Sequence, residues 1–100
     1  MNLLISIQPD GSRFTLGRVF ATPAALEVIA RSNASFVDLL SRHVCGDFGD
    51  LAECDRAQNE IAIATGERIL SSYVFPDKQT VWLITEQDRS ATTFLLPGDY

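Results

Sequence analysis

The pattern that most constrains the fold is a run of helix signals between two groups of strand-like segments. Residues 3–7 and 14–21 resemble strands separated by turn residues at 9–12, which predicts an opening β-hairpin. Residues 68–75, 80–85 and 92–96 resemble strands at the other end. This grouping favours an α+β fold, so we expect an antiparallel sheet, in the order ββ-ααα-βββ along the chain, with the helices packed on one face.

Two of the predicted helices have clear start signals. Thr22 can cap a helix that begins at Pro23. Proline suits the first helical position because the N–H that it lacks would have no acceptor within the helix there. Ser35, three residues before Asp38, resembles a capping box and predicts a second helix that ends at Gly46.

The third predicted helix covers about residues 51–65. Asp50 with Glu53 forms its N-cap pattern, and Gly66 suits the position after its end. We expect the buried side of this helix to be an apolar stripe at helical spacing. The stripe comprises Leu51, Cys54, Ala57 or Gln58, Ile61, and Ala64 or Thr65.

Length and composition indicate one domain, residues 1–100, with 46% hydrophobic residues. Residues 1–7 are too short and lack the basic start of a signal peptide, and no apolar run approaches a membrane span. The two cysteines, Cys45 and Cys54, are too few for a disulfide framework. We therefore expect a cytoplasmic protein with reduced thiols, Cys54 buried and Cys45 more exposed.

Thirteen acidic against eight basic residues give a net charge of −5, which disfavours direct binding to nucleic acid or to an anionic membrane. Between residues 38 and 60, six acids and two bases leave −4 of that charge. We expect either an acidic docking face for a basic or nucleic-acid-binding protein, or solvated residues at helix ends. The candidate face contains Asp47, Asp50, Glu53, Asp55 and Glu60, joined by Asp88 and Arg89 if the fold brings them near.

The single histidine, His43, supports an alternative enzymatic hypothesis. With Asp47 and Asp50 it would serve as the general base of a small hydrolase or nuclease. With Cys45 and Cys54 it would supply zinc ligands, although that spacing matches no common zinc site and a fourth ligand is missing. A histidine at a helix end more often binds the last carbonyls, so we expect no metal and no cofactor.

Several short segments are similar to one group of bacterial proteins. They are Leu16–Arg18, Ala21–Pro23, Arg42–His43, Gly46–Asp50, Asp55–Arg56, Asn59, Ser72–Tyr73, Trp82–Glu86, Asp88–Thr93, Leu95–Pro97 and Tyr100. Over residues 16–100 the chain resembles small uncharacterised proteins carried by plasmids and phages, some labelled as type I restriction-modification subunits. Phe48 stands where that family has tryptophan, and Cys54 where it tends to have an acid. The resemblance implies cargo of a mobile genetic element.

Together these observations predict a non-enzymatic protein-interaction factor carried by a mobile element. Small size, acidity and missing catalytic motifs make a counter-defence role, similar in style to anti-CRISPR proteins, the leading hypothesis. The alternatives are the His43 hydrolase or nuclease, and a structural subunit that self-associates, as a homodimer for instance, through strand edges or aromatic faces.

Overall fold

The structure, a computed structural model, describes residues 2, 3 and 11–100. The fold is α+β, as the sequence predicts. Its elements are β1 (Asn2–Leu3), β2 (Arg18–Ala21), α1 (Pro23–Arg31), α2 (Phe36–Val44), α3 (Glu53–Thr65), β3 (Ile69–Val74), β4 (Thr80–Thr85), β5 (Ala91–Leu95) and the 3-10 helix η1 (Pro97–Asp99).

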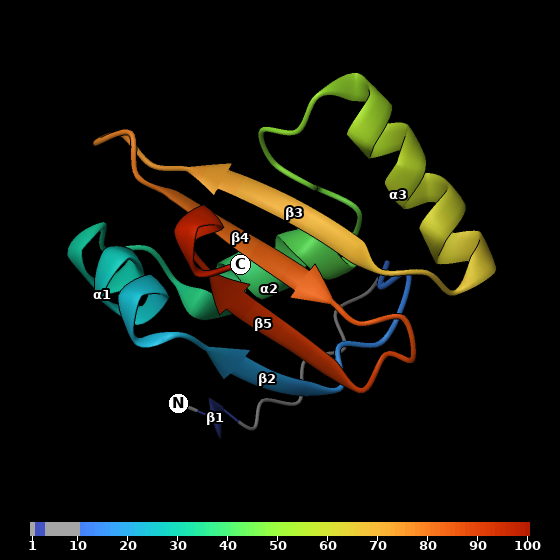
Figure 1. The fold of residues 1–100 in the computed structure, drawn as a ribbon, viewed down its shortest axis with the longest axis horizontal. Helices are drawn as coiled ribbons and strands as arrows, with labels where there is room; N and C mark the ends of the chain where they lie inside the picture. Colours follow the sequence, from blue (N-terminus) through green and yellow to red (C-terminus); the bar gives the residue numbers. More distant parts are fainter. Residues whose placement is uncertain (1, 4–10) are drawn as a thin grey trace.

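The strands form a sheet in the order β1-β2-β5-β4-β3 (Figure 1). Neighbouring strands are antiparallel except β2 and β5, which pair in parallel, so the expectation of a purely antiparallel sheet is wrong. Turns dictate the antiparallel pairing of β3, β4 and β5. No turn constrains β2 against β5, because the three α-helices and two strands separate them along the chain.

The opening hairpin is confirmed only in part. β1 pairs antiparallel with β2, in the register Asn2↔Phe20 and Leu3↔Val19. The rest of the expected first strand, residues 4–7, and the first half of the turn at 9–12 lie outside the described residues. Residues 14–17, which were expected to form the first half of the second strand, are not part of β2, because β2 begins at Arg18.

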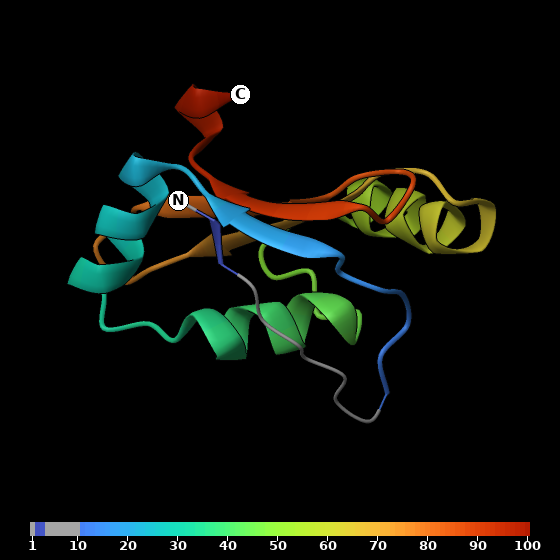
Figure 2. The same ribbon diagram turned by 90° about the horizontal axis from the view of Figure 1, so that it is seen from below.

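Two of the three α-helices pack on one face of the sheet, and the third does not. Figures 1 and 2 show α2 across one face, α3 beside the edge strand β3, and α1 at one end of the sheet. Of the helices in the described part of the chain, the opposite face carries only η1 (Figure 2). The expectation of helices packed on one face is correct for α2 and for α1, whose Ala25, Val28 and Ile29 join the same core, and wrong for α3, which lies along the sheet edge.

The first two helices begin where the sequence predicts. The hydroxyl of Thr22 accepts a hydrogen bond from the N–H of Ala25 at 3.2 Å, and the hydroxyl of Ser35 accepts one from Asp38 at the same distance. Asp50 does not cap α3, which begins at Glu53 with no side-chain cap. Its carboxylate instead accepts the N–H of Val74, 3.0 Å away, on the edge of β3.

The predicted buried stripe of α3 is wrong. Cys54, Ala57, Ile61 and Ala64 are all exposed, while Asn59 and Ala62 are buried. The reason is the place where the helix docks: it lies along a strand edge rather than over a sheet face. Only a narrow line of side chains can therefore reach the body of the protein.

A polar seam closes the free edge of β3. The side-chain amide of Asn59 donates to the carbonyl of Leu70 at 2.7 Å, and its oxygen accepts the N–H of Leu70 at 3.2 Å. Ser72 pairs in the same way with the loop before α3, donating to Phe48 O at 3.0 Å and accepting from Asp50 N at 2.6 Å. These contacts satisfy backbone groups that an edge strand would otherwise offer to another chain.

The main core lies between α2 and the covered sheet face. Its buried members include Leu39, Leu40, Val44, Val19, Tyr73, Val81, Leu83 and Phe94. A smaller cluster of Phe48, Ala62 and Ile69 lies beneath α3. No helix among the described residues is long and apolar enough to cross a membrane.

Candidate functional site

His43 lies in the core, not in a cleft. Its side chain is fully buried, with Nδ1 2.6 Å from the hydroxyl of Ser71 and Nε2 2.8 Å from that of Thr85. Thr85 in turn is 2.7 Å from the hydroxyl of Thr92, which donates to the carbonyl of Leu16. The expectation that His43 binds the last carbonyls of its helix is therefore wrong.

The last member of this hydrogen-bond network determines which groups donate and which accept. The Leu16 carbonyl can only accept, so the proton of Thr92 is committed to it. Thr85 must then donate to Thr92 and accept from the imidazole, which places the His43 proton on Nε2. Nδ1 accepts from Ser71. Every polar atom of the imidazole is thus used in holding α2 to the sheet.

These contacts exclude His43 as a general base. Burial lowers the pKa of His43 to about 3, and the charge of Arg89 adds to the shift. Neither Asp47 nor Asp50 hydrogen-bonds the ring, whose partners are hydroxyl groups. A general base must reach a substrate proton in a concave pocket, and the buried ring of His43 does not. The structure therefore contradicts the hydrolase or nuclease hypothesis built on His43.

The two aspartates after α2 support the local fold. Asp47 forms an ion pair with Arg42, at 2.8 Å between Oδ2 and Nε, and accepts the N–H of Gly49. The hydrogen bond from Arg42 is the main cause that lowers the pKa of Asp47. Gly49 sits at φ +73° against β3, where a Cβ would lie 2.1 Å from the Ser72 carbonyl oxygen. The loop is thus shaped for pairing with β3.

The cysteines do not join His43. Both Cys45 and Cys54 are exposed, so the expected burial of Cys54 is wrong, while the exposure of Cys45 is confirmed. Among residues 2, 3 and 11–100, no three His, Cys, Asp or Glu side chains form a group that could hold a metal ion.

The outward side of α3 is the most exposed part of the predicted docking face. Every residue from Ala52 to Gln58 is exposed, and Ile61 keeps 51% of its surface accessible. Glu53 and Asp55 form no ion pair within the described residues. Glu60 is held by Arg13 through two bonds of 2.7 Å each. Of the five predicted acids, Glu53 and Asp55 at the start of α3 therefore remain without an ion pair in the described part of the chain. Asp47, Asp50 and Glu60 are bound to other parts of the fold.

The turn after β4 uses Asp88 and Arg89 internally. Asp88 accepts both the N–H and the hydroxyl of Ser90, at 3.0 and 2.5 Å. Arg89 donates to the carbonyls of Glu67, Ala62 and Glu86, at 2.7, 3.1 and 3.2 Å. Its guanidinium ties the end of α3 to the β4–β5 turn, and so it has a positioning role.

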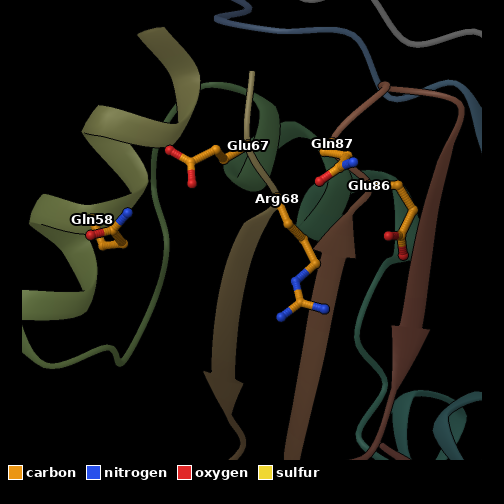
Figure 3. Close-up of a pocket in the computed structure, with 5 residues that line it drawn as sticks. All are labelled: Gln58, Glu67, Arg68, Glu86 and Gln87. Atoms are coloured by element: carbon orange, nitrogen blue, oxygen red, sulfur yellow. The ribbon is translucent and has the colours of Figure 1, made fainter. Parts of the chain in front are cut away.

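A polar depression of about 320 Å³ opens beside this tie (Figure 3). Figure 3 shows Arg68 near its middle, with the carboxylates of Glu67 and Glu86 on opposite sides. The residues that line it are Gln58, Glu67, Arg68, Glu86 and Gln87. Sequence reasoning named none of these five residues as a site, although Glu86 and Gln87 directly precede the predicted Asp88 and Arg89.

The uncovered face of the sheet is the second notable surface. Trp82 and Ile84 share it, as their alternation predicts, and Phe20 and Thr93 pair across it. Tyr100 packs edge-on against Trp82 at 6.1 Å and remains 66% exposed. This surface is aromatic and half-buried, and among the described residues no α-helix covers it (Figure 2).

Comparison with known protein families, curated proteins and solved structures finds no match.

Proposed function

We propose that this chain is a non-enzymatic protein-interaction factor that binds a basic partner through the outward face of α3. In keeping with the resemblance to proteins of plasmids and phages, we place it among the cargo of a mobile element, with a counter-defence role in the host cytoplasm. Occlusion of a partner surface requires no catalytic group, which fits the use of His43 as a core hydrogen-bonding residue.

The observation that carries the proposal is an apolar stripe turned to solvent. Cys54, Ala57, Ile61 and Ala64 follow one another at intervals of three, four and three residues and are all exposed. This spacing places them on one side of the helix, where helices usually pack against something. Because the fold buries Asn59 and exposes Ile61, the apolar side of α3 is available to a partner.

The charges beside the stripe determine which partner fits. Glu53 and Asp55 lie in the first turn and form no ion pair among the described residues. A partner surface with apolar side chains for Ile61 and basic ones for Glu53 is complementary in both shape and charge. The net charge of −5 adds a longer-range attraction for a basic protein.

A charge-reversal experiment tests the proposal. Tagged wild-type protein and a Glu53→Lys/Asp55→Lys variant are each incubated with lysate of a bacterial host, and the proteins recovered are compared. We expect a basic partner to be lost from the variant by at least tenfold. The matched control is Glu27→Lys/Asp38→Lys, which makes the same charge change on α1 and α2 and should retain the partner. Equal recovery by all three proteins would refute the acidic face.

The uncovered sheet face favours a second candidate function, which is self-association as a structural subunit. Val74 and Tyr100 are 46% and 66% exposed on that face, next to Trp82. The edge of β3 is closed by Asn59 and Asp50, which leaves the aromatic face, rather than this strand edge, as the contact surface.

A further inference from the structure

Residues 97–100, which we call the strap, lie over the open face of the sheet. The strap comprises η1 and Tyr100, and η1 contacts β4 (Figures 1 and 2). All four of its residues are exposed, and η1 contains no buried residue. The strap therefore adds little to the core, and its place on the molecule depends on contacts made at the surface.

The first of these contacts is made by Asp99. Its carboxylate accepts a hydrogen bond from the hydroxyl of Thr22 at 2.7 Å and one from the N–H of Leu96 at 3.0 Å. The hydroxyl of Thr22 can donate here because its oxygen serves separately as the acceptor for the N–H of Ala25. Asp99 thus joins the strap to the beginning of α1.

The second contact is made by Tyr100. Its ring packs edge-on against Trp82, with 6.1 Å between the ring centroids. The guanidinium of Arg68 donates to the Tyr100 hydroxyl and lies 5.3 Å over the Tyr100 ring. Tyr100 nevertheless keeps 66% of its surface exposed, so it covers Trp82 without being enclosed itself. Exposed contacts of this kind are individually weak, and the strap can leave the face without disturbing the core.

The surface around Trp82 is apolar. Leu95 is the register partner of Trp82 on β5, and Ile84 lies two residues further along β4 on the same side. Both are buried, at 7% and 5% exposure, although neither belongs to a core cluster on the other side of the sheet. Trp82 is therefore the half-buried part of an apolar area over which the strap lies.

We propose that the strap restrains self-association by occupying the aromatic centre of the open sheet face, an inference that rests on the second candidate function above. A second copy that binds this face through Trp82 competes with Tyr100 for the same ring. When a surface is available for only a fraction of the time, its apparent affinity falls by that fraction. In a symmetric dimer both copies present the same face, so the reduction applies twice.

The position of the strap can be followed directly, because Trp82 is the only tryptophan in the chain. Tyr100→Ala removes the ring that covers Trp82. Asp99→Ala removes the link to Thr22 and leaves that ring in place. In dilute solution, quenching of Trp82 fluorescence by acrylamide should increase by at least half in Tyr100→Ala and should change in the same direction in Asp99→Ala.

Light scattering then tests the restraint. The rise of apparent mass with protein concentration should move to at least fivefold lower concentration in both variants. The matched control is Ile61→Ala, because Ile61 is 51% exposed on α3, away from the open sheet face, and this variant should change neither measurement. Circular dichroism checks that each variant is folded.

The outcomes separate the strap from self-association. Unchanged quenching in both variants would overturn the strap, and a rise displaced to higher concentration would make Tyr100 a contact residue of the interface instead. If the wild type and both variants associate equally, the strap is refuted and self-association is retained. If all three stay monomeric while quenching increases, self-association is refuted, and the restraint with it.

Discussion

At the scale of single residues, His43 accepts a hydrogen bond from Ser71 and donates one to Thr85. Thr85 then donates to Thr92, and Thr92 to the Leu16 carbonyl. The sequence contains one sign of this hydrogen-bond network. Ser71, Thr85 and Thr92 occupy positions that alternate in step with the buried residues of their strands. Nothing in the sequence says that one imidazole reaches both Ser71 and Thr85, since the two belong to different strands. A polar group placed between hydroxyls specifies packing rather than catalysis here.

Mild acid is expected to destabilise the fold through His43. Its pKa is about 3 in the folded protein, against about 6.5 for an unperturbed histidine. The folded state therefore excludes a proton that the unfolded chain accepts. This contribution is complete above pH 6.5 and is lost as the pH falls toward 3. From pH 6.5 to pH 5 the free energy of unfolding should fall by about 1.5 kcal/mol, as measured by urea denaturation.

The single histidine makes this prediction easy to check. The ring signals of His43 in the folded protein should not titrate between pH 7 and pH 5. A His43→Gln variant should lose less than half as much stability over the pH window as the wild type. A histidine signal that titrates near pH 6.5 would contradict the buried, neutral ring.

At the scale of elements, α3 shows where local pattern stops being informative. Its apolar spacing predicts a helix, and the helix is present, but the same spacing identifies the wrong buried side. Asn59 decides the orientation because its amide can pair with both backbone groups of Leu70, as a neighbouring strand would. Arg13, Arg56 and Arg89 add polar contacts to Glu60 and to backbone carbonyls.

The two hydrogen bonds between Asn59 and the backbone of Leu70 act as a clamp, and their removal should weaken the attachment of α3 to β3. Asn59→Ala leaves the N–H and carbonyl of Leu70 without their partner, and we expect a loss of about 1–3 kcal/mol in the free energy of unfolding. Amide exchange at Leu70 should become faster than in the wild type. Gln58→Ala changes the preceding, exposed residue and serves as the control, with an expected change below about 0.5 kcal/mol. Equal effects of the two variants would argue against the clamp.

At the scale of the whole molecule, the sheet is covered on one face by α2 and left largely open on the other (Figure 2). The open face carries Phe20, Trp82 and Tyr100, and Arg18 lies 5.5 Å over the ring of Phe20. Exposed aromatic groups of this kind are frequent at protein interfaces. The β3 edge, whose backbone groups are already paired, is not available for strand pairing with a second copy.

A pair of valines tests self-association. We expect the apparent mass of the wild type in light scattering to rise with protein concentration. Val74→Lys, on the open sheet face, should shift this rise to at least tenfold higher concentration. Val37→Lys is the control, because Val37 on α2 is 49% exposed and Val74 is 46% exposed. A strict monomer at all concentrations would exclude this function.

The sequence by itself determines the elements and their order. Caps at Thr22 and Ser35, the turn at residues 76–79 and the alternation of β4 act over a few residues, so they can be recognised without knowledge of the remaining chain. The same holds for the −5 charge and for the concentration of acids between residues 38 and 60.

Only the tertiary structure decides the parallel pairing of β2 with β5, the buried side of α3 and the place of His43. It also brings Glu67 and Glu86 to one depression through Arg89. Each of these depends on contacts between residues distant in sequence. A local pattern states that a side chain is apolar or can form hydrogen bonds, whereas the packed fold determines which partner lies within reach.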